Sequence, residues 1–476
     1  MKVSNNYSEH LRHKVFDHIK TAAEKNEQDA FIIGGYVRDL ILENAGKDLD
    51  IVTSGNGIAL AQECAKLMDV KKIQIFKNFG TAMLKYRNWQ VEFVGARKES
   101  YRKHSRNPIV SSGTLEEDRF RRDFTINAMS ISLNPDSFGH FHDPFNGIRD
   151  LQNQIIRTPL DPLQTFSDDP LRMMRAIRFA SQLSFQIERE TLNGIRAMSE
   201  RIRIVAPERI SDELNKILLT EKPSLGLELL EKTGILNEIL PELVDLKGVQ
   251  EEDGKSHKEN FYHTLEVVDN IRKETTDLWL VYAALFHDIG KAPTRRFDPK
   301  VGFTFHGHEL KGSKMVPAIF RRLKLPLNES MRYVQKLIFL SSRPIALVSD
   351  DVSDSGVRRL LFDAGDHIDD LMTLCEADIT SKNPERVRRY KQNFKRVRRK
   401  LEEIEEKDRI RNFQPPIDGT EIVKTFEIKE GKVIGNIKSA VKEAILDGKI
   451  ANTQEEARRF MMKYAESKGI EIRRNE

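Results

Sequence analysis

Two aspartates separated by one apolar residue, in the segment KDLDIV at residues 47–52, place the strongest constraint on this chain. The alternation predicts a β-strand on which Asp48 and Asp50 project from one face while the apolar residues face a core. Adjacent carboxylates repel each other unless a divalent cation lies between them, and Mg²⁺ prefers carboxylate oxygens together with substrate phosphates. Taken alone, such a pair occurs more often in an Asp-rich turn, so its surroundings decide the interpretation.

A pair of glycines upstream favours the metal site. Gly34 and Gly35 follow the apolar run Ala30–Ile33, as expected of a strand that ends in a tight turn before a helix. Glycine amides can approach a phosphate chain closely, a helix N-terminus favours anions, and Arg38 can add a charge-assisted contact. A phosphate-binding turn beside paired carboxylates predicts metal-assisted attack of a hydroxyl on the α-phosphate of a nucleotide.

The apolar pattern divides the chain into a mixed α/β part, up to about residue 155, and a longer helical part. Glu92 is a candidate third carboxylate, because polymerase sites often use one from a neighbouring strand; an exposed strand glutamate is an equal alternative. Strands are predicted at 49–52, 81–86 and 90–94, the last two flanking a hairpin turn at 87–89. Helices are predicted at 170–184, 207–219, 224–239 and across 261–380, with a charged break near 251–258 and a helical tail at the end.

Composition narrows the setting. The chain has 476 residues and a net charge of +5, which is weak evidence for a nucleic-acid partner because local patches matter more than the sum. Its two cysteines, Cys64 and Cys375, show no pattern of a disulfide framework or a zinc site. The sequence has no apolar run of ~18 residues and no signal-peptide core. We therefore expect a cytoplasmic protein with no membrane partner, and no obligate protein partner is evident.

Six segments in order resemble the class II tRNA nucleotidyltransferase and bacterial poly(A) polymerase family. They are GGYVRD, KDLDIV, RRDFTINAM (121–129), HDPFNGIRDL (142–151), DDPLRMMRAIRFA (168–180) and PERISDEL (207–214). The resemblance covers about residues 25–220. It implies an α+β head with a DNA polymerase β-like nucleotidyltransferase sheet, followed by an all-α neck, an HD-type body and a tail. The expected domains are 1–155, 156–255, 256–384 and 385–476.

The resemblance also implies roles for individual residues. Asp48 and Asp50 would hold Mg²⁺. Glu92, proposed above on separate grounds, stays the candidate for a further catalytic carboxylate. The expected nucleotide-binding residues are Gly34, Gly35, Arg38, Arg121, Arg122, Asp123, Asn127, Asp169, Arg172, Arg175 and Arg178. Within this set, Gly35 and Arg38 would hold the triphosphate, Arg121 and Arg122 would contact the nucleotide, and Asp169 and Arg172 would pair with the incoming base.

The base-pairing role is chemically reasonable. A helix is expected over 168–180, with Ser167 or Asp168 as its N-cap, and residues spaced by three along it share a face. Cytosine and adenine each offer a ring-nitrogen acceptor beside an amine donor, which a guanidinium next to a carboxylate complements. Guanine and uracil present the reverse polarity, and each buried group left unpaired costs ~1–3 kcal/mol. Without the family context, this series would read as a basic helix surface. Asp168 stands where the family usually has glutamate.

Two features bear on which nucleotides are added. The basic, Ser-containing segment 95–117 resembles the flexible loop that the family uses when switching from C to A addition. Bacterial poly(A) polymerases carry a basic signature after the DxD region, and residues 75–81 lack it. We therefore expect a CCA-adding enzyme with tRNA, CTP and ATP as partners. Poly(A) addition and CC-only or A-only addition remain alternatives.

The helical body contains a second set of candidate metal ligands: His263, His287, Asp288 and Asp378. The HDIGK segment at 287–291 matches the HD-domain phosphohydrolase signature, and this set can enclose a second divalent metal. The expected activity is hydrolysis of 2′,3′-cyclic or terminal phosphates. As an alternative to nucleotide transfer, this hydrolysis would be the main reaction of the chain. The alternative is a helical domain that only supports RNA binding. His306 and His308 could extend the site.

The stretch 386–400 places many cationic side chains on a predicted helix. In a tRNA-acting enzyme we expect phosphate contacts to the acceptor arm, with binding that weakens steeply with salt. The alternative is a solvated helix face.

Overall fold

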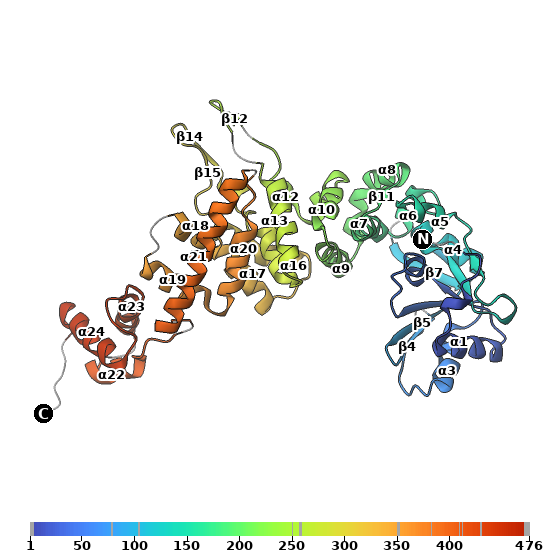
Figure 1. The fold of residues 1–476 in the computed structure, drawn as a ribbon, viewed down its shortest axis with the longest axis horizontal. Coiled ribbons are helices and arrows are strands. Elements are labelled where there is room, and N and C mark those ends of the chain that lie inside the picture. The colour runs from blue at the N-terminus through green and yellow to red at the C-terminus, as the bar shows by residue number, and fades with distance from the viewer. Residues whose placement is uncertain are drawn as a thin grey trace. The chain divides into compact units, whose positions relative to one another are not determined.

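The computed structural model describes residues 4–77, 80–102, 105–249, 251–256, 259–349, 353–381, 383–408, 410–411, 413–428 and 431–470. The chain divides into two compact units, Met1–Pro241 and Glu242–Glu476, which are described separately. In the first unit a mixed sheet precedes a run of helices, and the second unit is mainly helical (Figure 1). Within the described residues, no helix is long and apolar enough to cross a membrane.

The first unit is built on a seven-stranded sheet with the order β3-β4-β5-β2-β1-β8-β9. Strand β2 runs parallel to β5, and the other neighbouring pairs are antiparallel. The strands predicted at 49–52, 81–86 and 90–94 are confirmed, including the hairpin. The strands are β1 (Ala30–Ile33), β2 (Asp48–Thr53), β3 (Ile73–Phe76), β4 (Thr81–Tyr86), β5 (Trp89–Gly95), β8 (Ser130–Ser132) and β9 (Phe141–His142).

Helices cover this sheet because its inward-facing residues are apolar: Ile32, Leu49 and Phe93 are at most 1% exposed. Close packing of one helix relies on glycines, since a Cβ on Gly57 would lie 2.8 Å from the backbone nitrogen of Gly95. The helices of this part are α1 (Lys14–Lys25), α2 (Gly35–Ile41), α3 (Gly57–Leu67), α4 (Leu115–Phe120) and α5 (Gly147–Gln152).

The segment 95–117, predicted as a flexible loop, instead carries an antiparallel ribbon of β6 (Arg97–Arg102) and β7 (Ser105–Ser112), and then begins α4. The loop prediction was wrong about its backbone, because cross-strand pairing outweighs a polar composition that lacks clear alternation. Its suggested part in the switch from C to A addition stays a prediction.

The rest of the first unit is helical, with one correction to a helix and one to a cap. Residues 224–239 form two helices, because Gly234 adopts a left-handed φ of +84° between them. Asp168 ends a preceding helix rather than capping the next one. The helices are α6 (Pro162–Asp168), α7 (Leu171–Leu183), α8 (Arg189–Met198), α9 (Pro207–Leu218), α10 (Pro223–Lys232) and α11 (Ile235–Ile239), and a short strand pair joins β10 (Ile155–Ile156) to β11 (Gln186–Ile187).

The second unit contains α14 (Leu278–Phe286), a helix that is apolar on every side and is buried from Leu280 onward. Its flanking helices are α13 (Asn260–Glu274), α15 (Lys291–Thr294), α16 (His308–Arg322), α17 (Glu329–Leu340), α18 (Ser342–Ser349), α19 (Asp354–Ala364) and α20 (Ile368–Ala377). Beyond them lie α21 (Pro384–Asp408), α22 (Gly419–Phe426), α23 (Lys432–Leu446) and α24 (Gln454–Ser467). The helical prediction for 261–380 is confirmed, apart from the hairpin β14 (Arg296–Asp298) and β15 (Gly302–Thr304).

Several short elements complete the fold. The predicted break near 251–258 contains a small hairpin of β12 (Glu251–Glu252) and β13 (Lys255–Ser256), and α12 (Pro241–Val244) lies at the division between the units. Single 3₁₀ turns occur at Ser8–His10, Thr125–Asn127, Pro135–Ser137, Ser199–Ile204 and Gly365–His367. The four predicted domain ranges stay a prediction.

Candidate active site

Three carboxylates share one face of the sheet in the first unit. On the parallel strands β2 and β5, Asp50 is the register partner of Glu92. Asp48 lies two residues before Asp50, so it projects from the same face. All three are exposed, whereas Leu49 and Ile51 between them are 1% exposed. The chemistry of this donor set fits a divalent metal, because hard cations prefer several carboxylate oxygens.

The glycine turn lies directly against these carboxylates. Gly34 has φ +81°, which favours glycine, and a Cβ at this position would lie 3.1 Å from Oδ2 of Asp50 and 3.6 Å from Nη1 of Arg122. A side chain at this position would therefore press against both a carboxylate and a guanidinium. The Gly34 backbone, the Asp50 carboxylate and the Arg122 guanidinium therefore lie close together.

The electrostatics of Asp50 reflect that crowding. Although its side chain remains accessible to solvent, desolvation by the surrounding protein raises its pKa; the repulsion of Asp48 adds to this, and Arg122 opposes it. A bound divalent cation would remove this repulsion, which is a second reason why the donor set fits a metal.

Helix α4 holds two adjacent arginines in place. Thr114 and Glu117 form a reciprocal capping box at its N-terminus, so the helix start is well defined. The buried carboxylate of Asp118 accepts from Nε of Arg121 at 2.9 Å and from Nη2 of Arg122 at 3.1 Å. Burial opposes ionisation, but the two guanidiniums outweigh it and lower the pKa of Asp118.

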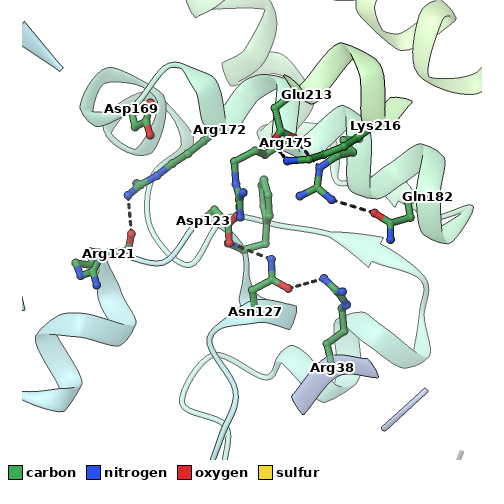
Figure 2. Close-up of polar contacts among 12 residues, drawn as sticks. Arg38, Arg121, Asp123, Asn127, Asp169, Arg172, Arg175, Gln182, Glu213 and Lys216 are labelled. Carbon is green, nitrogen blue, oxygen red and sulfur yellow. Dashed lines mark hydrogen bonds and ion pairs between the residues drawn. The ribbon is translucent and has the colours of Figure 1, made fainter. Parts of the chain in front are cut away.

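A buried polar network follows immediately (Figure 2). Asp123 accepts from Nε of Arg175 at 2.8 Å and from Asn127 at 3.0 Å, and Asn127 in turn accepts from Nη1 of Arg38 at 2.9 Å. Burial raises the pKa of Asp123, but Arg175 and Asn127 outweigh it, so that the pKa falls to about 2. Asp123 is therefore charged at neutral pH.

The arginines of α7 are all engaged by neighbouring groups. Nη2 of Arg172 donates to the carbonyl of Arg121 at 2.7 Å, and Nη1 donates more weakly to that of Thr165 at 3.4 Å. Nε of Arg178 donates to Glu213 at 2.6 Å and its guanidinium lies 3.9 Å from the ring centre of Phe179. The prediction of a shared helix face is consistent with Figure 2, where Arg172 and Arg175 extend from α7 toward Arg121 and Asp123.

Asp169 lies just before α7 and receives the backbone N–H of Leu171 at 3.1 Å and Nη2 of Arg209 at 3.2 Å. Asp169 therefore stabilises the start of the helix, a role that the sequence analysis predicted for Ser167 or Asp168. A carboxylate has about four acceptor sites, so Asp169 retains capacity for a ligand amine.

Arg38 is placed differently from its expected phosphate contact. It is 5% exposed, and its guanidinium is held by Asp39 at 2.8 Å and by Asn127. It also lies 4.9 Å from the ring centre of Phe179. In this structure the guanidinium of Arg38 is held by neighbouring side chains, and its contact with a triphosphate stays a prediction.

The second unit brings His263, His287, Asp288 and Asp378 together, and we call these four residues the HD site. Nε2 of His263 lies 2.8 Å from Oδ1 of Asp378, and Nε2 of His287 lies 3.7 Å from the same oxygen. Ligand atoms of His263, His287 and Asp378 all fall within 4.8 Å of one another. Oδ2 of Asp288 lies 3.4 Å from Nε2 of His287.

The histidines of the HD site are oriented as metal ligands are. Nδ1 of His287 lies 2.7 Å from the carbonyl of Ala284, which requires a proton on Nδ1 and leaves Nε2 as the available ligand atom. That Nε2 atom is buried and has no hydrogen-bond partner in the described residues. Nδ1 of His263 is likewise held, at 2.8 Å, by the hydroxyl of Thr380. The residues therefore fit a divalent metal.

The carboxylates of the HD site shift the pKa of His287. Burial lowers the pKa of His287, but Asp288 and Asp378 outweigh it and raise the pKa to about 9. Lys291 lies 2.6 Å from Oδ2 of Asp288. Of the two further histidines, His308 approaches Oδ1 of Asp288 at 3.7 Å, while His306 is exposed.

Three family models match parts of the chain. The poly(A) polymerase head domain matches residues 30–157, the probable RNA- and SrmB-binding site of polymerase A matches 184–246, and the HD domain matches 260–378. The A-adding tRNA nucleotidyltransferase of Deinococcus radiodurans is 31% identical over 367 residues, which cover 74% of this chain and 80% of that relative.

The chain belongs to the tRNA nucleotidyltransferase family.

The names of further relatives refer to the addition of different nucleotides. The CC-adding enzyme of Thermus thermophilus is 29% identical over 91% of this chain and 93% of its own. The multifunctional CCA protein of Herminiimonas arsenicoxydans is 34% identical over 62% and 69%. The A-adding enzyme of Aquifex aeolicus is 40% identical, but the chain spans only 26% of its length. This chain is accordingly a nucleotidyltransferase, and the names leave its product open.

A solved structure supports the same conclusion. A tRNA nucleotidyltransferase complexed with a primer tRNA and an incoming ATP analogue aligns with a TM-score of 0.57 at 25% identity, over 80% of this chain and 98% of that one. The predicted fold class, a polymerase β-like head followed by helical parts and an HD domain, is confirmed. The nucleotidyltransferase and HD families generally use divalent metals.

Sequence reasoning missed several residues that organise this nucleotidyltransferase site. Asp118, Glu213 and Arg209 hold Arg121, Arg178 and Asp169 respectively. Phe179 lies beneath the guanidiniums of Arg38, Arg175 and Arg178. The sequence does show acidic residues on neighbouring helices. They were missed because only residues expected to contact a ligand were considered.

Proposed function

We propose that this chain is a CCA-adding tRNA nucleotidyltransferase, which adds C, C and A from CTP and ATP to the tRNA 3′ end and releases pyrophosphate. One observation carries the proposal. Asp50 and Arg122 both lie beside the Gly34 turn, and the carbonyl of the adjacent Arg121 accepts a hydrogen bond from Arg172 on α7. The carboxylates that would serve the chemistry are thus joined to the residues that would read the base. The proposal includes a cytoplasmic location, which the buried, unpaired Cys64 and Cys375 support.

The carboxylates have a defined task in this reaction. Asp48 and Asp50, with Glu92 beside them, would hold Mg²⁺. When bound, the ion would activate the primer 3′-hydroxyl and neutralise charge on the leaving pyrophosphate. The Gly34 turn lets the backbone approach the triphosphate, and Arg122 adds positive charge close by. Asp118 keeps Arg122 in that position.

Base selection would fall to Asp169 and Arg172. A guanidinium has five donor hydrogens, and the two contacts of Arg172 leave others for a ring-nitrogen acceptor of cytosine or adenine. Asp169 would accept from the exocyclic amine. Both side chains are anchored to the protein, so the reading surface is rigid before the nucleotide arrives, and a base of reversed polarity leaves buried groups unpaired.

A nucleotide-incorporation assay tests this proposal. Transfer RNAs ending at the discriminator base, at C and at CC are incubated with CTP, ATP, or both, and GTP and UTP serve as controls. Completion of CCA from all three substrates is the expected result. A stop after CC, activity only on the CC-ending tRNA, or a long A tail would instead identify the CC-adding, A-adding or poly(A)-adding alternative.

A second candidate function is phosphohydrolysis at the HD site. The buried Nε2 of His287 favours it, because this atom faces the carboxylates of Asp288 and Asp378 while Nδ1 is held by a carbonyl, an orientation suited to bind a metal. Water would add to phosphorus and one P–O bond would break, as in opening a 2′,3′-cyclic phosphate to a monophosphate. Hydrolysis of p-nitrophenyl phosphate and 2′,3′-cyclic AMP with Mn²⁺ or Ni²⁺ tests it. Loss of hydrolysis with EDTA and in Asp378→Asn is expected; hydrolysis that survives both changes would refute it.

A further inference from the structure

The wall of one cavity in the second unit is shared with the HD site. This cavity, of about 710 Å³, is lined by His263, Asp378 and Thr380, and also by residues of the basic helix α21. Asp378, whose Oδ1 lies 2.8 Å from Nε2 of His263, is one of the lining residues, so the cavity reaches a ligand of the site. Whatever fills the cavity therefore lies next to the metal-binding residues.

One stripe of α21 faces this cavity. Arg386, Tyr390 and Phe394 recur every four residues, which places them along one side of the helix, and all three line the cavity. The guanidinium of Arg386 lies 5.8 Å from the ring centre of Tyr390. A different side of the same helix, with Arg388, Lys391 and Lys395, lines a separate surface hollow. The basic helix thus has two faces, and only one of them faces the HD site.

Helix α13 adds a second aromatic ring to the cavity lining. Tyr262 on α13 is adjacent in sequence to His263, lines the cavity and is 45% exposed. Ile345 adds an apolar contact surface, and Glu259 and Glu266 add carboxylate acceptors. Two tyrosines suit the flat faces of a nucleobase, acceptors suit ribose hydroxyls or a base amine, and Arg386 suits a phosphate.

We propose that α21 supplies the nucleoside-binding wall of the HD site, on which the base of a nucleotide substrate of that site stacks. The inference rests on the proposed phosphohydrolase function and names its specificity residues. The base stacks on Tyr390 and Tyr262, and Arg386 holds the phosphate near the metal ligands. Arg386 then belongs to the HD site, whereas binding of the tRNA acceptor arm would use the other face of α21.

Equilibrium binding separates this inference from the function on which it rests. Binding of adenosine 3′-monophosphate and of inorganic phosphate to the full chain with Mn²⁺ is measured by calorimetry, and His287→Ala identifies the signal that belongs to the HD site. Stacking contributes enough that Tyr390→Ala should weaken nucleotide binding roughly 10-fold or more. Inorganic phosphate, which has no base, should bind this variant as tightly as the wild type.

Matched variants complete the test. Arg386→Ala should weaken binding of both ligands, whereas Arg396→Ala, at another exposed arginine of α21 that is outside the cavity lining, should weaken neither. Tyr262→Ala gives an independent test if Tyr390→Ala folds poorly, since Tyr262 is half exposed. Wild-type nucleotide affinity in both tyrosine variants would overturn the inference while leaving the phosphohydrolase intact. Absence of any phosphate binding or hydrolysis in the wild type would instead remove the phosphohydrolase function itself.

Discussion

Single residues at the nucleotide site have little freedom to change, and Gly34 illustrates the reason. Its backbone lies in the left-handed region, and the space that a Cβ would need is bounded by Asp50 and Arg122. A methyl group there adds backbone strain of roughly 1 kcal/mol and also displaces the carboxylate.

Gly34→Ala should lower nucleotide incorporation by about 100-fold, because small displacements of catalytic groups have effects of that size. The fold should persist, as checked by circular dichroism. Gly46→Ala is the matched control, since nothing lies within 4 Å of a Cβ at Gly46. Wild-type incorporation by Gly34→Ala would show that the turn does not need to approach the nucleotide closely.

Asp123 should contribute stability that depends on pH. Its folded-state pKa of about 2 lies below the ordinary value, so the stabilisation is fully present above about pH 4 and is lost as the pH falls through about 2. Asp123→Asn should therefore cost about 2 kcal/mol at pH 7. The difference from wild type should shrink below pH 4 in denaturant unfolding. Asp69→Asn, at an exposed position, should change neither quantity; a pH-independent difference for Asp123→Asn would contradict the ion-pair explanation.

Elements with strong alternation could be predicted from the sequence, and elements without it could not. Strands β2, β4 and β5 have one apolar face each and were predicted nearly to the residue. Strand β3 was missed because its residues are mostly exposed. Asp118 escaped notice for a similar reason: a charged helix such as α4 reads as solvated surface, and only the fold shows that this carboxylate is buried.

The register of β2 and β5 makes a prediction about Glu92. Because Glu92 is the register partner of Asp50, Glu92→Gln should reduce kcat for incorporation by roughly 100-fold, an effect typical of removing one charged catalytic contact. Binding of tRNA, measured by filter retention, should change little. Glu24→Gln, the same change at an exposed position of α1, serves as control. Equal effects of the two changes would indicate that Glu92 is an ordinary exposed strand residue.

At the scale of the whole molecule, the two candidate sites lie in different compact units. The sequence motifs indicated both sites, but their supporting contacts, such as Thr380 to His263, come from residues far apart in the chain and required the fold.

The two reactions should be separable by single substitutions. Asp48→Ala should abolish nucleotide incorporation and leave hydrolysis of 2′,3′-cyclic AMP at the wild-type rate. Asp378→Asn should do the reverse, since Asp48 belongs to the first unit and the described side-chain contacts of Asp378 are with histidines of the second. Both rates are measured on the same preparations of the full chain. Loss of both activities in either variant would indicate that the sites work as one.

The bond from Arg172 to the Arg121 carbonyl has an evolutionary consequence. The acceptor is a main-chain atom, which no substitution at Arg121 can delete, whereas its donor is the side chain proposed to read the base. A mutant that changes nucleotide preference at Arg172 would also lose an anchor between α7 and the loop after α4. New specificities should therefore arise through paired changes, in which a compensating substitution restores the anchor before or together with the altered reading residue.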